Sequence, residues 1–130
     1  MATIFEKIIQ GEIPCAKIYE DDEFISFLDV NPLAEGHTLV LPKQPEPYIF
    51  DIADEKYDRL MKLVKKIAMH LKEKTGCKRV CMAVIGWEVP HTHVHLIPTN
   101  DMKEVPLDGP YRKQANFEDL SKLAEKLQLK

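Results

Sequence analysis

Apolar side chains recur every three or four positions in two parts of the chain, which is typical of amphipathic helices. The first part is residues 4–9, and Gly11 and Pro14 after it predict the end of a short helix. The second part, residues 54–75, predicts the main helix, with Gly76 as its C-terminal stop. Its apolar face consists of Tyr57, Leu60, Met61, Val64, Ile67, Ala68 and Leu71.

Strand-like patterns account for much of the remaining chain. Alternating apolar and polar residues on either side of Asp21-Asp22 predict a hairpin, and a loop at residues 31–36 leads to a third strand. Residues 80–85 are continuously apolar, which is typical of a strand buried on both faces. After a break at residues 86–90, another strand is expected to pair with it in antiparallel fashion. The five expected strands are residues 16–20, 23–28, 37–41, 80–85 and 91–97.

Together these elements predict an α+β domain. We expect a five-stranded antiparallel sheet with a short N-terminal helix, one long helix and an additional C-terminal helix from Asn116. The chain of 130 residues can bury a real core, and it contains no internal repeat and no linker. We therefore expect residues 1–130 to form a single domain, with residues 99–130 as a loop-plus-helix extension. The loop at residues 99–115 is longer than most compact domains contain, which makes it a candidate for lining a site or contacting a partner.

Charge and cysteine content exclude several classes of function. Lys and Arg total 18 against 21 for Asp and Glu, so the formal net charge is -3 and no global positive field holds a nucleic acid polymer. The longest apolar stretches are far shorter than the roughly 20 residues that span a bilayer, and the opening residues do not read as a signal sequence. We therefore expect a cytoplasmic protein without a membrane partner. Cys15, Cys77 and Cys81 lack Cys-x-x-Cys spacing, so we expect reduced, mostly buried thiols rather than disulfides or a four-thiolate zinc site.

Three of the five histidines fall within five consecutive residues, and this cluster is the strongest chemical signal in the chain. Side chains of a strand alternate between its two faces, so His91, His93 and His95 are expected on one face. Three buried imidazoles each need hydrogen-bond partners and offer little packing advantage over valine. A functional role is therefore favoured over incidental burial in a core.

Two kinds of chemistry use such a row of imidazoles, metal binding and catalysis at phosphorus. Alternate residues of a strand lie about 6.7 Å apart and the outer pair about 13 Å, too far for three nitrogens to reach one ion at about 2.1 Å. Two histidines could bind a metal with ligands from elsewhere, but the run itself contains no acidic residue. Near neutral pH a free imidazole nitrogen can attack phosphorus while neighbouring imidazoles donate to the phosphate oxygens. The row favours this second chemistry, and no cofactor is expected.

The segment His91-Thr92-His93-Val94-His95-Leu96-Ile97 resembles the His-x-His-x-His-x-x signature of the histidine-triad (HIT) family of nucleotide-binding proteins. Residues 4–14 resemble the opening of the Hint branch of that family, and residues 29–32 and 36–43 also match its pattern. The resemblance covers roughly residues 3–98. The chain is therefore similar to a bacterial-type HIT nucleotide hydrolase.

The resemblance implies a role for each histidine. His93 would attack the α-phosphorus and form a nucleotidyl-histidine intermediate that water then resolves. His95 would donate to phosphate oxygens, His91 would help order the site, and His37, on the neighbouring strand, would complete the cluster. Asp29 would accept hydrogen bonds from the ribose hydroxyls, a role for which a carboxylate is suited.

An apolar slot for the nucleotide base is also implied. Its residues would be Phe5, Ile8, Phe27, Leu28 and Val30. Without the resemblance, Phe5, Ile8 and Phe27 read as ordinary core residues, and Asp29 could simply shape the turn before Asn31-Pro32.

The implied function is that of a nucleoside phosphoramidase: a nucleotide hydrolase or transferase acting at the α-phosphate of purine nucleoside phosphoramidates, such as AMP derivatives. A homodimer joined through the main helix and a strand is implied as well. Three alternatives stay open: a dinucleoside polyphosphate hydrolase, a nucleotide-binding regulatory module with weak catalysis, and a metal-binding protein that uses the histidine strand. Some bacterial relatives hold a structural zinc, but Thr3, Glu6 and Pro45 occupy its ligand positions here, so no metal is expected.

The loop before the histidines departs from the family pattern. Trp87 stands where relatives commonly have glutamine, and Glu88 where Hint relatives often place a serine thought to protonate the leaving group. An exposed carboxylate would be ionised at pH 7, so the proton donor for that step stays open. Residues 80–85 also lack the amide side chain that relatives use upstream.

Overall fold

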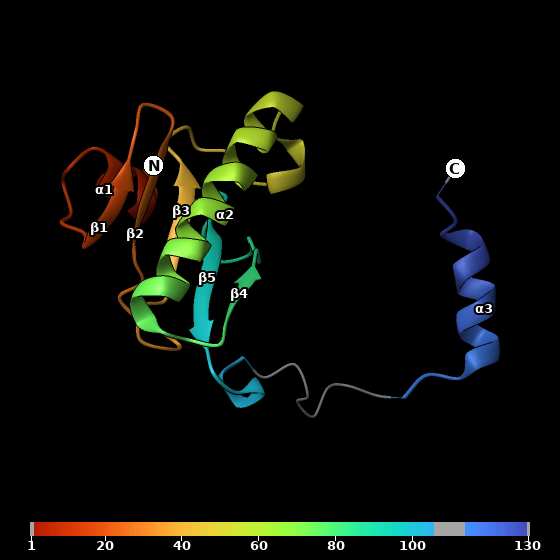
Figure 1. The fold of residues 1–130 in the computed structure, drawn as a ribbon. Coiled ribbons are helices and arrows are strands. Elements are labelled where there is room, and N and C mark those ends of the chain that lie inside the picture. The colour runs from red at the N-terminus through yellow and green to blue at the C-terminus, as the bar shows by residue number, and fades with distance from the viewer. Residues whose placement is uncertain (1, 106–113, 130) are drawn as a thin grey trace.

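The computed structural model describes residues 2–105 and 114–129 and shows an α+β fold (Figure 1). In this part of the chain five strands form one antiparallel sheet, and the long helix α2 lies across one of its faces. These features confirm the predicted fold class. The strands are β1 (Lys17–Glu20), β2 (Phe24–Leu28), β3 (Thr38–Pro42), β4 (Arg79–Ala83) and β5 (Val94–Thr99). The helices are α1 (Ile4–Ile9), α2 (Asp54–Thr75) and α3 (Phe117–Lys126), with short 3-10 turns at Ile49–Asp51 and Met102–Glu104.

The strand order β1-β2-β3-β5-β4 places the histidine strand β5 inside the sheet. On one side β3 sets Leu39 opposite His95, and on the other side β4 sets Ala83 opposite the same histidine. The predicted antiparallel pairing of β4 with β5 is confirmed. Because His37 immediately precedes β3, this order brings it beside the histidines of β5.

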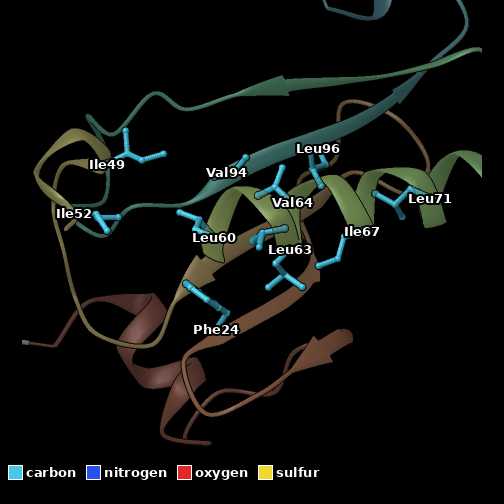
Figure 2. Packing of buried hydrophobic residues seen from close by; sticks show 11 residues of the cluster. Phe24, Ile49, Ile52, Leu60, Leu63, Val64, Ile67, Leu71, Val94 and Leu96 are labelled. Atoms are coloured by element: carbon cyan, nitrogen blue, oxygen red, sulfur yellow. The ribbon is translucent and has the colours of Figure 1, made fainter. Parts of the chain in front are cut away.

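Helix α2 spans the residues that the apolar periodicity predicts. It ends at Gly76, which has φ 71° and donates its N–H to the carbonyl of Lys72. A left-handed residue of this kind favours glycine, because a Cβ would be strained there. The buried face of α2 packs against Val94 and Leu96 of β5 (Figure 2). Its members are Leu60, Leu63, Val64, Ile67 and Leu71.

A second apolar cluster packs on the opposite face of the sheet. It contains Phe5 of α1 together with Ile25, Phe27, Leu39 and Leu41. Phe24 and Val40, which alternate with these residues along the same strands, belong to the cluster on the α2 side. Since Val94 and Leu96 also face α2, the alternation leaves His93 and His95 on the face that carries Phe5.

The prediction that residues 80–85 are buried on both faces is wrong. Strand β4 lies at an edge of the sheet, and Met82 and Ile85 are 53% and 63% exposed. A continuous apolar run looks the same whether the fold covers it or leaves it open, because strand order depends on residues far away in the chain.

The strand predicted for residues 91–97 begins only at Val94. The amide of His91 donates to the carbonyl of Val89, and the amide of Thr92 donates to that of Glu46, so neither joins the sheet ladder. The first two histidines of the row therefore lie in an irregular segment rather than on a regular strand.

The three cysteines are free, in agreement with the expectation of reduced thiols. Cys77 is buried, whereas Cys15 and Cys81 are only half-buried, so these thiols are more accessible than predicted.

The predicted C-terminal helix is present as α3. Asn116 caps it, since its side-chain oxygen accepts from the amides of Glu118 and Asp119. The expected loop at residues 99–115 starts with the end of β5 and a 3-10 turn, and its residues 106–113 lie outside the described part. Within residues 2–105 and 114–129, no helix combines the length and the apolar character that crossing a bilayer demands.

Candidate active site

The structure brings four histidines together beside α1. The rings of His93 and His95 lie 5.0 Å apart between centroids, and those of His37 and His95 lie 5.2 Å apart. Phe5 contacts the ring of His93 edge to face, with centroids at 4.7 Å, and also that of His91 at 5.9 Å. The cluster is therefore continuous from His91 to His37.

His93 is held in one tautomer by the main chain. Its Nδ1 lies 2.8 Å from the carbonyl oxygen of His91. A carbonyl only accepts hydrogen bonds, so Nδ1 carries the proton and Nε2 keeps its lone pair. A neutral imidazole with a free Nε2 is suited to attack an electrophile.

His37 and His95 are joined in a chain of hydrogen bonds with one direction. The amide N–H of Leu33 donates to Nδ1 of His37 over 3.0 Å, so the proton of this ring lies on Nε2. That Nε2–H donates to Nδ1 of His95 over 2.9 Å. The proton of His95 is consequently on its own Nε2. The site thus sets a ring with a free nitrogen, His93, beside a ring that offers an N–H, His95.

His91 supports this arrangement from inside the protein. It is fully buried, and its Nε2–H donates to the carbonyl of Pro42 over 2.7 Å. Its Nδ1 is buried and has no hydrogen-bond partner among the described residues. His91 has no exposed surface, and its carbonyl is the group that forms the hydrogen bond with the ring of His93.

Burial keeps these rings neutral. Desolvation lowers the pKa of His37, although Asp29 opposes the shift. Desolvation also lowers the pKa of His95, and the neighbouring His93 and His37 add to the effect. The pKa of His91 is lowered by burial as well, against the opposing effect of its bond to Pro42. The hydrogen bonds at His37 and His95 require neutral rings, since the Nδ1 of each ring must accept.

Asp29 has a structural role and a free oxygen. Its Oδ1 accepts from the amide of Asn31 over 2.9 Å, which shapes the turn that the sequence suggested. Its Oδ2 lies 3.6 Å from Nε2 of His37. One carboxylate oxygen therefore orders the loop while the other lies at the border of the histidine cluster.

Asp29, His37 and His95 also offer metal-ligand atoms within 4.8 Å of one another. The spacing of the three clustered histidines does not predict this set, because Asp29 and His37 lie elsewhere in the sequence. Nδ1 of His37 already accepts from Leu33, so its Nε2 would have to lose a proton before it could bind an ion. The hydrogen bonds therefore suit proton transfer better than metal coordination.

The residues expected to form the base slot divide into two groups. Phe5 and Phe27 are buried and lie 6.1 Å apart between ring centroids, and Ile8 packs against their cluster. Leu28 is half-buried, and Val30 is 85% exposed. Phe5 thus contacts two of the histidines, Ile8 and Phe27 belong to the same apolar cluster, and Val30 lies outside it.

The loop between β4 and the histidines is open to solvent. Trp87 is 90% exposed and Glu88 is exposed too. Gly86 has φ 76°, a turn that favours glycine, and Val89 returns the chain to the apolar cluster of Phe5. The loop holds no buried carboxyl that could stay protonated at pH 7.

Comparison with known proteins finds relatives that match most of this chain. A family model described as HIT domain matches residues 10–102. An adenosine 5'-monophosphoramidase of Saccharomyces cerevisiae is 37% identical over 127 residues, which cover 97% of this chain and 80% of the yeast protein. An adenylylsulfatase of Arabidopsis thaliana is 35% identical over 103 residues, 75% of this chain and 52% of the plant protein.

Solved structures agree with this placement. The crystal structure of a HIT family member from Bacillus subtilis superimposes with a TM-score of 0.80 at 30% identity and covers 95% of this chain and 93% of its own. A histidine triad nucleotide-binding protein from Candida albicans gives a TM-score of 0.73 at 34% identity, over 97% of this chain and 94% of its own.

Proposed function

Because this chain belongs to the HIT family, we propose that it is a nucleotide hydrolase or transferase that acts at the α-phosphate of purine nucleoside phosphoramidates or related nucleotides. The observation that carries the proposal is the pair of opposite proton positions on His93 and His95. One ring offers a lone pair to phosphorus and its neighbour offers an N–H to a phosphate oxygen. The names of the yeast and plant relatives support a nucleotide substrate.

In the first step, Nε2 of His93 forms a bond to the α-phosphorus and the bond from phosphorus to the leaving amine breaks. The Nε2–H of His95 donates to a non-bridging oxygen, where negative charge builds up. The Nδ1–H of His93 stays hydrogen-bonded to the carbonyl of His91, and this bond stabilises the positive charge of the substituted ring. The amine departs after it takes one proton from solvent.

In the second step, water attacks the same phosphorus and the bond to Nε2 breaks. The hydroxyl of the water remains on the nucleoside monophosphate, and its other proton is released to solvent, which balances the proton taken by the amine. His93 returns to its neutral form. Since Glu88 is exposed, we place no proton-donor role on it. The catalytic step needs no metal ion and no cofactor.

The nucleoside would lie along the histidines, against the outer side of the apolar cluster of α1 and β2. We place the base against Phe5, Ile8, Phe27, Leu28 and Val30. The free Oδ2 of Asp29 would accept from the ribose hydroxyls, because its Oδ1 is already occupied by Asn31. The large exposed fraction of Val30 is consistent with a side chain that a ligand covers.

We also propose a homodimer formed through β4 and α2 in the cytoplasm. An open strand edge with exposed apolar side chains, here Met82 of β4 and Ile85 just after it, favours pairing with a second chain. Each chain would contribute one HIT domain of residues 1–130, in which residues 99–130 form an extension beyond most of the matched family region.

The deciding experiment is release of AMP from an adenosine phosphoramidate by metal-free protein. We expect turnover by the wild type and a loss of more than about a thousandfold in His93→Ala, because the nucleophile is removed. His70→Ala is the matched control, since His70 is an exposed histidine on α2, and it should keep wild-type turnover.

AMP binding by calorimetry separates the remaining possibilities. His93→Ala should still bind AMP, because the base and ribose contacts remain. If wild-type protein binds AMP but cleaves no phosphoramidate, the proposed reaction is wrong. A dinucleoside polyphosphate, which offers the same phosphorus with a different leaving group, would then be the next substrate to assay, and no cleavage of either would indicate a binding module.

A further inference from the structure

Thr92 lies between two histidines of the site but does not face a ligand. It is 1% exposed, and it borders a small apolar pocket with Pro47 and Tyr57 on the side away from the imidazoles. Its amide N–H and its hydroxyl both donate to the carbonyl of Glu46, over 2.7 and 2.6 Å. Two donors from one residue thus hold a single oxygen of a distant loop.

The amide of Thr92 and the carbonyl of His91 belong to the same peptide unit. A trans peptide is planar, so its N–H and its C=O point in opposite directions. When the N–H is held on Glu46, the carbonyl of His91 must point the other way, toward the Nδ1 of His93 at 2.8 Å. The oxygen of Glu46 therefore fixes the acceptor that fixes the tautomer of His93.

Glu46 is itself held in place. Pro45 and Pro47 flank it and restrict the backbone on both sides. Its carboxylate accepts from the Nζ of Lys56 in the first turn of α2 over 2.9 Å. The lysine side chain is 14% exposed and that of Glu46 is 31% exposed, so this ion pair is partly shielded from water. The loop is thereby anchored to the longest helix of the protein.

We propose that Thr92 is a positioning residue that sets the tautomer and the direction of the His93 ring, with Glu46 and Lys56 as its support. Any residue here except proline could donate its amide N–H to the carbonyl of Glu46. The hydroxyl of Thr92 adds a second hydrogen bond to the same oxygen. The predicted effect on turnover rests on the proposed function, whereas the effect on the His93 ring does not.

The experiment compares Thr92→Val, which removes the hydroxyl but keeps the shape, with Thr92→Ser, which restores it. Thr99→Val is the matched control, because Thr99 is also buried and its hydroxyl donates to the carbonyl of Arg79, away from the histidines. Nitrogen-15 NMR of the imidazole rings reports which nitrogen of His93 carries the proton, and steady-state kinetics with an adenosine phosphoramidate report kcat and KM.

In wild-type protein, Thr92→Ser and Thr99→Val, we expect the His93 signals of the Nδ1–H form. In Thr92→Val they should move toward the Nε2–H form, and kcat should fall about threefold to tenfold, the effect of one neutral hydrogen bond, with KM within about twofold. Wild-type signals in Thr92→Val, or an equal shift in Thr99→Val, would overturn the proposal.

Lys56→Met covers the case in which Thr92→Val does not fold. It removes the anchor of Glu46 from the outside and should shift the His93 signals in the same direction, and unchanged signals would count against the proposal. If wild-type protein shows no turnover at all, the proposed function fails, and the NMR signals of the variants still decide the role of Thr92.

Discussion

The Nε2–H of His37 donates to the Nδ1 of His95 over 2.9 Å, and the amide of Leu33 is what sets this direction. Without the amide, either ring could carry the shared proton. With it, His95 must keep its own proton on the nitrogen that is free for a phosphate oxygen. A main-chain group in a surface loop therefore prepares a side chain inside the site.

Replacement of His37 tests this chain of hydrogen bonds. In His37→Phe an aromatic ring still fills the space, but the Nε2–H donor is lost, so His95 is free to change tautomer. We expect kcat for an adenosine phosphoramidate to fall about 10-fold to 100-fold, as for other residues that orient a functional imidazole. AMP binding by calorimetry should change little. His70→Phe, an exposed histidine on α2, should behave as wild type, and a similar loss there would contradict the explanation.

Removal of metal ions tests the proton assignment at Asp29, His37 and His95. Because the Nε2 of His37 carries a proton, we expect dialysis against EDTA to leave turnover within about twofold. Elemental analysis of the dialysed protein should find no stoichiometric zinc. Activity that disappears with EDTA and returns with zinc would show that a metal ion replaces the proton on the Nε2 of His37.

Stability should depend on pH in a defined window. The folded-state pKa values of His37, His91 and His95 are lowered from 6.5, mainly by burial, so below pH 6.5 the unfolded chain takes up protons that the folded chain does not. The free energy of unfolding should then decrease as the pH falls from 6.5 toward 5. This loss precedes that from Glu20, whose pKa Lys17 and Lys43 hold at about 2, below its usual 4.5.

Urea denaturation at pH 7.5 and 5.5 measures the change. His91→Gln removes one of the buried rings, so its free energy of unfolding should fall less between the two pH values than that of the wild type. His70→Gln should retain the full wild-type decrease. An identical decrease in all three proteins would show that the buried histidines do not control it.

The open edge of the sheet predicts how a second chain binds. Met82→Lys places a charge on β4, where apolar side chains are exposed, so dimerisation should weaken by about tenfold or more. Analytical ultracentrifugation over a range of concentrations measures it. Ile18→Lys makes the same change on β1, the strand at the other edge, and should leave the dimer intact. A dimer that survives Met82→Lys but not Ile18→Lys would place the interface at β1 and contradict the prediction.

Local patterns in the sequence predict much of the fold. The 22 residues of α2 repeat the apolar periodicity over several turns, so its extent and its end at Gly76 can be read directly. The alternation around the histidines likewise separates the imidazole face from the face of Val94 and Leu96. The edge position of β4 could not be read, because it depends on which strands pair across the whole chain.

The proton arrangement of the site could not be predicted either. It depends on the amide of Leu33 and on the carbonyls of Pro42, His91 and Glu46. Every residue has a carbonyl and nearly every residue has an amide, so these groups leave no mark in a sequence. Thr92 is the partial exception, because a hydroxyl in an otherwise apolar position of the row is a visible signal that buried polar groups need partners.

The loop at residues 31–36 sets the direction of the hydrogen bond between His37 and His95. His37 accepts from Leu33 on Nδ1 and donates from Nε2 to His95, so the proton position on the first ring sets that on the second. If the amide of Leu33 were turned away, both rings could reverse together, and His95 would then present a lone pair where it now presents a proton. The shape of an exposed turn thus decides whether the Nε2 of His95, a ring that the turn does not touch, is a donor or an acceptor.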